Sequence, residues 1–414
     1  MKILFICDLN SIHAQKWIDF FIKRKHDVTV YSTTPFAENF RGLRVFSSSH
    51  GSPAVPASAG TWIQKIFESI PTVLWTDVLE TLFVLKKSFS IRYDTARHRN
   101  AVSPIVHQIQ PNIIHALRIP NEGFIAARLQ TGIPFVISTW GNDLIYWARK
   151  RLLTGLTRET LGRASLLLSD CERDVRLSRE YGYPREKPFL ELPGSGGMSK
   201  EQLEEGRLSL KKRMNFPAAS LANAGRPIFL SLRGFGSQDI DNVPLLEACR
   251  LLAKLGERFT LILVGRKGGY RYFKLVHLIK RYRLENKVIL LDELPHKGAL
   301  RALQSADFYV SIAHNDGLPN SLMEAMTYGA IPLTSDLESI REWVEEGKNG
   351  YFFDPSDAPS IARAMERAMH ESAKQAVMRR LNHALVCGKG NYEQNMARVE
   401  SVFLQLASHW EKKS

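Results

Sequence analysis

The chain has 414 residues, more than a single hydrophobic core usually fills, so we expect two domains. Hydrophobic residues make up 44% and charged residues 24%, which is ordinary for a globular enzyme and excludes a wholly disordered chain. The formal net charge of +14 predicts anionic partners, but no dense Lys/Arg tract, zinc-finger spacing or RNA-binding aromatic signature occurs, so we expect no nucleic acid partner.

The opening ten residues and the four cysteines predict a cytoplasmic protein. "MKILFICDLN" is a short apolar run stopped by Asp8, which is typical of a first strand rather than a signal peptide. No run of about 18 residues is apolar and uncharged, so no segment is expected to span a membrane. The cysteines show no C-x-x-C spacing and are interpreted as reduced thiols, not as a metal site or a disulfide framework.

The first half of the chain alternates short β-branched runs with amphipathic segments. Buried strands that alternate with helices predict a parallel sheet covered on both faces. The predicted strands are 2–7, 27–32, 111–117, 134–139 and 164–170, and the predicted helices are 13–25 and 122–130.

The alternation stops at the turn-rich stretch 192–200 and resumes at 227–235. The later predicted strands are 258–265, 287–294, 307–313 and 330–335, with a helix at 320–328 and a final helical stretch at 391–412. We therefore predict domains at 1–195 and 196–390, and a C-terminal helix, 391–414, that returns to the first domain. Ligands of open parallel sheets bind outside the carboxyl ends of the strands, so two such domains should face each other across a cleft that holds two substrates.

The segment "HNDGLPNSLMEAMTYGAIPLTSD", residues 314–336, follows the buried strand 307–313 and begins with a loop and a helix that Gly329 should end. Asn320 and Ser321 are expected to cap this helix, and its free backbone N–H groups suit a phosphate. The spacing places Leu322, Ala325 and Met326 on the core face, and Ser321, Glu324 and Tyr328 on the opposite face.

Two carboxylates, Asp316 and Glu324, stand eight positions apart in this segment. If a diphosphate lies at the helix start, Glu324 can accept hydrogen bonds from a ribose diol, and Asp316 can reach hydroxyl groups further along the ligand. The alternative is that Glu324 only complements the helix dipole and Asp316 only fills a turn. Either acid alone fits that alternative, but the whole arrangement is far less generic.

The stretch "DGLPNSLMEAMTYGAIPLTSD", followed by "EEGKNGYFFDP", resembles the signature of glycosyltransferase family 4. The resemblance is strong over about 228–355 and weak in the first domain. It implies the GT-B fold, with two Rossmann-like domains, and a retaining hexosyltransferase that uses a UDP- or GDP-linked sugar. Glu324 would bind the ribose, and Asp316 would bind the transferred sugar. At the position of Asp316 the family more often has a glutamate.

The resemblance also implies further donor contacts. Arg233, in "LSLRGF", would neutralise the diphosphate leaving group. The loop 234–249 lacks the lysine that the family usually adds, so Lys267 or Arg266 would replace it. Around the helix start, the remaining donor-binding residues would be Gly317, Leu318, Asn320 and Ser321.

In the first domain the resemblance implies acceptor-side positions after two strands. Asn10 and Ser11 stand where relatives often carry glycines, and His13 follows them. Trp140 replaces the family's histidine, so we expect it to stack on a sugar, with Asp143 as a ligand for hydroxyl groups.

No cofactor and no metal are expected. "DID", at 239–241, has the spacing of a metal-binding acid pair in another transferase fold, but a solvated loop that ends in a helix cap is the preferred interpretation. A nucleotide-sugar epimerase of the same fold, or a non-catalytic sugar- or nucleotide-binding protein, remains the alternative to a transferase.

Residues 62–99 combine aromatic side chains with a trailing basic cluster. These are Trp62, Phe67, Trp75 and Phe83, followed by Lys86, Lys87, Arg92, Arg97 and Arg99. Such a pattern fits either a core segment with a solvated face or an interfacial segment on anionic lipid. Together with the resemblance, it predicts polysaccharide biosynthesis on a glycan or lipid-linked acceptor, at the inner face of the cytoplasmic membrane.

Overall fold

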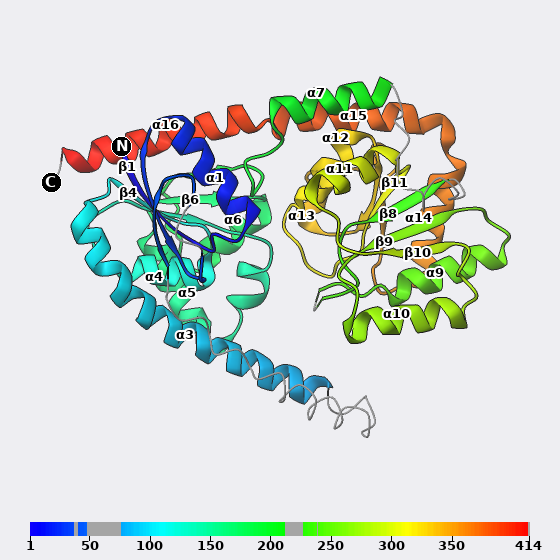
Figure 1. Cartoon of the computed structure of the whole chain (residues 1–414), viewed down its shortest axis with the longest axis horizontal. Helices are drawn as coiled ribbons and strands as arrows, with labels where there is room; N and C mark the ends of the chain where they lie inside the picture. Colours follow the sequence, from blue (N-terminus) through cyan, green and yellow to red (C-terminus); the bar gives the residue numbers. More distant parts are fainter. Residues whose placement is uncertain (37–39, 48–75, 212–226, 238, 413–414) are drawn as a thin grey trace. The chain divides into compact units, whose positions relative to one another are not determined.

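The computed structural model describes residues 1–36, 40–47, 76–211, 227–237 and 239–412. The chain forms two compact units (Figure 1). Unit 1 comprises Met1–Ser169, Asp174–Glu191 and Arg398–Ser414, and unit 2 comprises Asp170–Arg173 and Leu192–Ala397. Each unit is described by itself below.

In the described residues of unit 1, seven parallel strands form one sheet in the order β3-β2-β1-β4-β5-β6-β7. The five strands from β2 to β6 in this order have apolar runs that are buried on both faces, whereas the end strands β3 and β7 are partly exposed. The strands are β1 Lys2–Cys7, β2 Asp27–Ser32, β3 Arg44–Ser47, β4 Ile113–Ala116, β5 Phe135–Ser138, β6 Leu166–Ser169 and β7 Phe189–Glu191.

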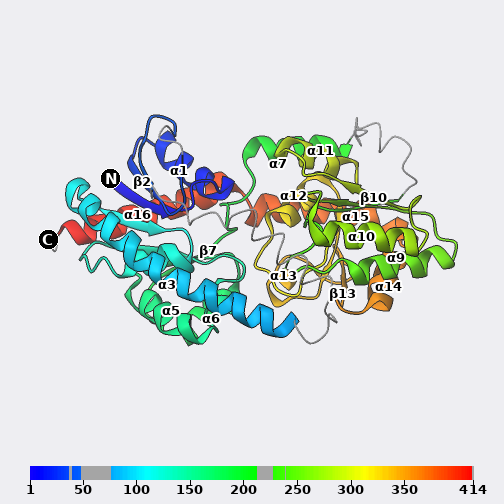
Figure 2. The same ribbon diagram turned by 60° about the horizontal axis from the view of Figure 1, so that its bottom comes forward.

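Helices cover both faces of this sheet (Figure 2). The α1 helix and the end of α16 lie on one face, and α3, α4 and α5 pack together on the other. The helices are α1 Ile12–Lys23, α3 Thr76–Ile109, α4 Phe124–Ala127, α5 Arg151–Arg163, α6 Glu172–Glu180 and α16 Tyr392–Glu411.

The strand order reverses between β1 and β4, because the chain leaves β1 toward β2 and returns through α3 to the other side of β1. Such a switch point opens a crevice at the carboxyl ends of the two strands. The loops after β1 and β4 therefore meet at the carboxyl ends of the strands, where ligands of open parallel sheets generally bind.

The last part of α16 belongs to unit 1, which confirms the predicted return of the C-terminal helix. Phe403 stacks on Phe21 with ring centroids 5.3 Å apart. The Glu400 carboxylate pairs with Arg24 at 2.9 Å and lies 2.7 Å from His26 Nε2. The helix is thus held by an apolar stack and by a charged group at the same turn of α1.

In the described residues of unit 2, six parallel strands form a sheet in the order β10-β9-β8-β11-β12-β13. The strands are β8 Ile228–Ser231, β9 Thr260–Val264, β10 Val288–Leu291, β11 Phe308–Ser311, β12 Ile331–Ser335 and β13 Tyr351–Phe353. The helices are α7 Lys200–Lys211, α9 Val243–Lys254, α10 Gly269–Arg281, α11 His296–Ser305, α12 Asn320–Tyr328, α13 Glu338–Arg341, α14 Ala358–His370 and α15 Ser372–Lys389.

The strand order of unit 2 reverses between β8 and β11, which are direct neighbours. The loop after β8 carries Arg233 and the loop after β11 carries Asp316, so the topology brings these residues to one edge. The helix that follows, α12, ends as predicted at Gly329, whose φ of +90° is the left-handed conformation that favours glycine.

One of the helices predicted for unit 1 is much shorter in the structure. The helix predicted at 122–130 is only the short α4, because the chain first makes a wide turn at Ile119–Gly123 in which Asn121 has a φ of 67°. Pro120 lacks the N–H that a regular helix would use there.

Among the helices of the described residues, none combines the length and the apolar character needed to span a membrane.

Candidate functional site

Arg233 and Asp316 form an ion pair at the carboxyl ends of β8 and β11. Arg233 Nη2 donates to Asp316 Oδ2, and their side chains are only 19% and 16% exposed. Burial disfavours the charged form of Arg233, but its neighbours Asp316, Tyr309 and Asp239 together outweigh this effect and raise the pKa of the guanidinium. The structure thus brings together two of the three predicted catalytic residues and keeps a fixed positive charge in a sheltered position.

The backbone of Asp316 is fixed by two side chains that the sequence analysis missed. Its carbonyl oxygen accepts hydrogen bonds from Arg173 Nη1 at 2.5 Å and from Ser339 Oγ at 2.8 Å. Arg173 follows β6 by only four residues, so its place after a buried strand was the available signal. These bonds hold the Asp316 loop in one conformation.

The predicted donor-binding residues Gly317 and Leu318 are positioned by Asp170. Leu318 donates its backbone N–H to Asp170 Oδ2 at 3.2 Å. A side chain on Gly317 would place its Cβ only 2.4 Å from the same oxygen, so glycine is required by close approach and not by its φ. Both residues therefore lie against the buried Asp170 carboxylate just before α12.

The predicted capping of α12 by Asn320 and Ser321 is wrong. Pro319 occupies the N-cap position in an extended conformation, and no side chain caps the helix. Asn320 instead accepts a hydrogen bond from Ser195 Oγ at 2.6 Å, and Ser321 Oγ lies 2.6 Å from Tyr309 Oη. Proline has a φ suited to helix entry, and its ring carries no acceptor atom, so the N-cap residue cannot accept a hydrogen bond from the first turn.

Glu324 extends from the first turn and a half of α12 and is 14% exposed. Its Oε1 lies 2.7 Å from Nε2 of His296, the first residue of α11. His296 was not predicted, because nothing in the sequence shows that the start of α11 faces α12. The pair places a carboxylate on the same helix as the Asp316 loop, within reach of a ligand at the helix start.

The prediction that Tyr328 lies on the exposed face with Glu324 is wrong. Tyr328 is 2% exposed, and its hydroxyl donates to Glu205 Oε2 at 3.1 Å. The reason is that α7, α11 and α15 all pack on α12, so only a narrow strip of this helix is open. Leu322, Ala325 and Met326 are buried as predicted.

Arg266 and Lys267 follow β9, next to the loop after β8. Arg266 lines a pocket of about 500 Å³, together with Gly234 to Gly236 and Tyr270 to Tyr272. Lys267 donates its backbone N–H to Asp292 Oδ1 at 3.2 Å. Neither side chain forms an ion pair with a described residue. Both cations are therefore free to meet a ligand, which leaves the choice between them open.

The "DID" loop is tied down by hydrogen bonds. Asp241 Oδ1 accepts the N–H of Val243, the first residue of α9, at 3.0 Å, and thereby satisfies a helix N-terminus as predicted. The Asp239 carbonyl accepts the N–H of His314 at 2.8 Å. The Asp241 carboxylate thus serves the connection to α9, and the Asp239 carboxylate accepts a hydrogen bond from Asn315 Nδ2 at 3.4 Å, next to Asp316.

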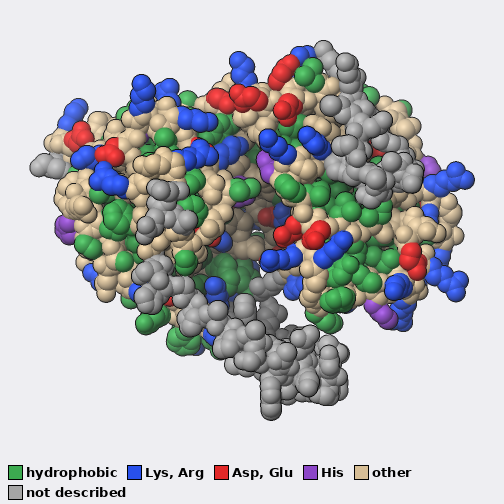
Figure 3. Space-filling view, in the orientation of Figure 1, with side chains coloured by type: hydrophobic (Ala, Val, Ile, Leu, Met, Phe, Trp, Pro, Cys, Tyr) green, Lys and Arg blue, Asp and Glu red, His purple; other side chains and the backbone are tan. Residues whose placement is uncertain are grey.

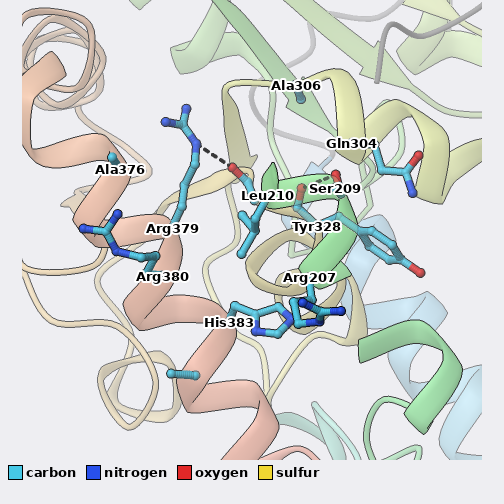
Figure 4. A pocket seen from close by; sticks show the side chains of 12 residues that line it. Arg207, Ser209, Leu210, Gln304, Ala306, Tyr328, Ala376, Arg379, Arg380 and His383 are labelled. Carbon is cyan, nitrogen blue, oxygen red and sulfur yellow. Dashed lines mark hydrogen bonds between the residues drawn. The ribbon is translucent and has the colours of Figure 1, made fainter. Parts of the chain in front are cut away.

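A second pocket, of about 530 Å³, lies at the opposite end of α12 (Figure 4). Three of its basic side chains are engaged: Arg379 Nε donates to the Gly329 carbonyl at 2.9 Å, Arg207 pairs with Glu204, and His383 bonds to the Leu203 carbonyl. Arg380 also lines the pocket. The sequence analysis assigned no role to this pocket. The predicted site residues lie at the start of α12, and this pocket lies beyond its end.

In unit 1, His13 and Trp140 lie together at the ends of β1 and β5. Their rings meet edge to face with centroids 6.1 Å apart. Trp140 is half-buried, so one part of its ring can still contact a ligand. The structure thus joins two acceptor-side residues that stand far apart in the sequence.

The expectation that Asp143 binds substrate hydroxyl groups does not fit its surroundings. Asp143 is 1% exposed, and Arg118 donates to its Oδ1 at 2.8 Å. Its Oδ2 accepts the backbone N–H groups of Ile119 and Trp140, both at 3.2 Å. With both oxygens engaged inside the protein, Asp143 positions the Trp140 backbone instead.

The loop after β1 contains the remaining acceptor-side residues. Asn10 Nδ2 donates to Thr34 Oγ1 at 3.0 Å, and Ser11 is the N-cap residue of α1 without a side-chain capping bond. Glu122, which was not predicted, lies buried near this edge and accepts a hydrogen bond from Thr33 Oγ1 at 2.9 Å. Burial raises the pKa of Glu122 to about 7.

The basic side chains of the described residues do not gather over one element on the face of the molecule drawn in Figure 3. Figure 3 shows Lys and Arg side chains scattered among other residues on the visible face, without a continuous basic stripe over the described residues. Nucleic-acid-binding proteins usually cluster these residues on one face or along one helix.

Comparison with known proteins gives a family match over the part of the chain that contains Arg233, Asp316 and Glu324. Residues 213–384 match the family model of glycosyl transferases group 1. WcaL of Salmonella typhimurium, described as a colanic acid biosynthesis glycosyltransferase, is 33% identical over 144 residues, which cover 32% of this chain and 35% of that protein. The GDP-mannose:cellobiosyl-diphosphopolyprenol alpha-mannosyltransferase of Xanthomonas oryzae is 27% identical over 228 residues, 53% of this chain and 54% of that protein.

The whole fold has solved counterparts. The structure of HepE from Anabaena in complex with UDP has a TM-score of 0.69 and 15% sequence identity, and the match covers 98% of this chain and 100% of that one. The sequence matches, by contrast, span only about a third to a half of the relatives' length. The chain therefore has the GT-B fold of glycosyltransferases, and its residues 213–384 carry the sequence pattern of the group 1 glycosyl transferases.

Proposed function

We propose that this protein is a retaining glycosyltransferase of family 4 that transfers a sugar from a nucleotide-diphosphate sugar to a hydroxyl acceptor in polysaccharide biosynthesis. The observation that carries the proposal is the convergence of Arg233, Asp316 and the start of α12 at the switch point of unit 2, with Glu324 farther along the same helix. The Xanthomonas oryzae relative is named for GDP-mannose, and HepE was solved in complex with UDP. Both support a nucleotide-diphosphate sugar as the donor.

The donor would lie across the start of α12. Its diphosphate would meet the Arg233 guanidinium and the N–H groups of the first helical turn, which favour negative charge. The ribose diol would donate hydrogen bonds to Glu324, and hydroxyl groups of the transferred sugar would reach Asp316. Because Arg233 and Asp316 are paired without ligand, donor binding would exchange part of that ion pair for phosphate and hydroxyl contacts.

In the transfer step, the acceptor oxygen would form a bond to the anomeric carbon on the face from which the diphosphate leaves. The bond between this carbon and the phosphate oxygen breaks, and the departing phosphate oxygen takes the acceptor proton. The protein then mainly orients the two substrates and stabilises the charge on the leaving group through Arg233. No metal is needed for this charge balance.

The assignment of Glu324 gives the first test. Replacing Glu324 by glutamine should weaken binding of the donor nucleotide by roughly 10- to 150-fold, because a charged acceptor contributes about 1.5–3 kcal/mol to such hydrogen bonds. Binding is measured by thermal shift and calorimetry with nucleoside diphosphates and their sugars, in EDTA and with magnesium. The matched control is His296→Gln, which removes the partner of Glu324 but keeps its carboxylate.

The outcomes separate the candidate functions. Equal affinity of wild type and Glu324→Gln would show that the ribose site lies elsewhere. Conversion of the donor sugar in the absence of any acceptor would favour the epimerase, and binding that requires magnesium would overturn the metal-free mechanism. A stabilisation of about 2.7 kcal/mol is expected at a ligand concentration a hundred times the dissociation constant.

For the acceptor, we propose a lipid-linked glycan at the cytoplasmic membrane face, reached through α3. Leu85, Phe89 and Tyr93 are 42%, 61% and 72% exposed and stand four residues apart, so they share one side of the helix. Lys86 and Lys87 are exposed beside them. The predicted anchors Trp62, Phe67 and Trp75 lie outside the described residues, and so does the side chain of Phe83.

Binding to membranes tests this proposal. Changing Lys86, Lys87 and Arg99 to glutamine should weaken sedimentation with anionic vesicles by about 100-fold, at ~1 kcal/mol per basic residue near the surface. Nucleotide affinity should stay the same. Arg92 is kept, because its guanidinium donates to the Leu152 carbonyl at 2.9 Å.

The control for the membrane experiment changes three exposed lysines of unit 2, Lys254, Lys274 and Lys280, to glutamine. This variant loses the same charge and should still bind anionic vesicles as the wild type does. If wild-type protein stays in the supernatant with anionic vesicles at low salt, the acceptor is not reached in this way and a soluble acceptor is favoured.

A further inference from the structure

The pocket at the carboxyl ends of β8, β9 and β10 has the size and lining of a nucleobase site. Its volume is about 500 Å³, within the usual range for small-molecule sites. Its residues come from three consecutive loops of unit 2, the first of which also carries Arg233. A ligand with its diphosphate at Arg233 would therefore extend its other end into this pocket.

Glycines keep the pocket open. Gly236 has a φ of +143°, and a Cβ there would lie 3.1 Å from Arg271 Cδ and 3.2 Å from the Ile240 carbonyl oxygen. Gly268, with a φ of +91°, precedes α10 on the opposite loop. A side chain at Gly236 would press against both neighbours, so the loop suits close approach of a flat ligand.

Two tyrosines offer aromatic surface to such a ligand. Tyr270, in the first turn of α10, is 74% exposed, which is unusual for so large an apolar ring. Tyr272 also lines the pocket and packs against Phe235 with ring centroids 5.4 Å apart. Stacking on an aromatic side chain suits any base, since every base has a π-face, so these residues do not choose among bases.

The charged side chains of the pocket, in contrast, can distinguish one nucleobase from another. Arg266, Arg271 and Glu293 all line it, and none of these side chains forms a hydrogen bond or ion pair with another described residue. A carboxylate accepts hydrogen bonds only, and a guanidinium donates only. The pocket thus offers one acceptor group and two donor groups to whatever base it holds.

This combination matches guanine better than uracil. Guanine has two adjacent donors, N1–H and the N2 amino group, that one carboxylate can accept together, and O6 and N7 acceptors that an arginine binds in bidentate fashion. Uracil has a single N–H between two carbonyl oxygens, which would repel a carboxylate. Adenine has one amino group and no adjacent N–H.

We propose that the donor of this enzyme carries guanine, with Glu293 on the N1–H and N2 amino groups and one of the two arginines on O6 and N7. The inference rests on the proposed function, because it assumes that the diphosphate lies at Arg233. It narrows the donor to a GDP-linked sugar.

The test compares GDP, UDP and xanthosine diphosphate binding to the full chain by calorimetry. Wild type should bind GDP roughly 10- to 100-fold more tightly than UDP, the range expected for hydrogen bonds to a charged group. Glu293→Gln should lose this preference. It should also gain affinity for xanthosine diphosphate, because the glutamine amide can donate to the C2 carbonyl and accept from N1–H.

The matched control is Glu285→Gln. Glu285 is exposed and lies just before β10, at the amino end of this strand, whereas Glu293 follows its carboxyl end. It should leave all three affinities unchanged. If wild type binds UDP as tightly as GDP and Glu293→Gln changes neither, the guanine assignment is wrong while the transferase proposal stands. If wild type binds none of the nucleotides, the proposed function itself fails and the inference fails with it.

Discussion

Replacing Arg233 by glutamine should lower the turnover of sugar transfer by roughly 100- to 1,000-fold, the usual effect of removing one group that stabilises transition-state charge. The diphosphate gains negative charge as the bond to the anomeric carbon breaks, and Arg233 is the cation that the structure places at the end of β8. Its surroundings exclude most water, so its charge is screened less than that of a surface arginine.

The measurement is the kcat of Arg233→Gln with saturating donor and acceptor. Arg281→Gln, at the exposed end of α10, removes the same charge from unit 2 and should keep wild-type turnover. Melting of both variants is recorded, because Arg233 is the buried partner of Asp316. Wild-type kcat in a folded Arg233→Gln protein would remove Arg233 from the mechanism.

Replacing Asp316 by asparagine should have two separable effects. It leaves the mostly buried Arg233 without its counter-charge, and breaking such a pair from one side typically costs about 3–5 kcal/mol of folding free energy. It also removes the proposed contact to the transferred sugar, so turnover should fall more than nucleotide affinity. The loop itself should persist, because Arg173 and Ser339 hold the Asp316 carbonyl and not its carboxylate.

A double-mutant cycle separates the two roles of Asp316. If Asp316 acts only as the partner of Arg233, the variant with both substitutions should be as active as Arg233→Gln alone. If Asp316 also binds the sugar, the double variant should be slower than either single one. Sugar transfer at the wild-type rate by a stable Asp316→Asn protein would contradict the assignment of Asp316 to the donor sugar.

The hydrophobic pattern by itself determined most of the secondary structure. The predicted strand 27–32 and helix 320–328 coincide with β2 and α12, and Gly329 ends α12 with a positive φ. Such features depend on neighbours within a few positions: the periodicity of buried residues, and the conformational freedom of glycine. Alternation of strands and helices was enough to predict two parallel sheets, which the structure confirms.

The same local pattern also placed Arg233 and Asp316 correctly at strand ends. Each follows a buried run, and in parallel sheets the residues after the strands collect at one edge. That the two loops are neighbours follows from the strand order, which a single sequence does not state. The ion pair between Arg233 and Asp316 therefore could not be predicted from the sequence, although both residues were predicted as site residues.

Contacts between distant elements were decided only by the tertiary structure. His296 meets Glu324 because α11 packs on α12, and Asp170 excludes any side chain at Gly317 although they are 147 positions apart. Asp143 was expected to bind substrate hydroxyl groups but is enclosed by Arg118 and two backbone N–H groups. Spacing along the chain fixes the face of an element on which a side chain lies, whereas its partner depends on which other element covers that face, and this is set by packing of the whole unit.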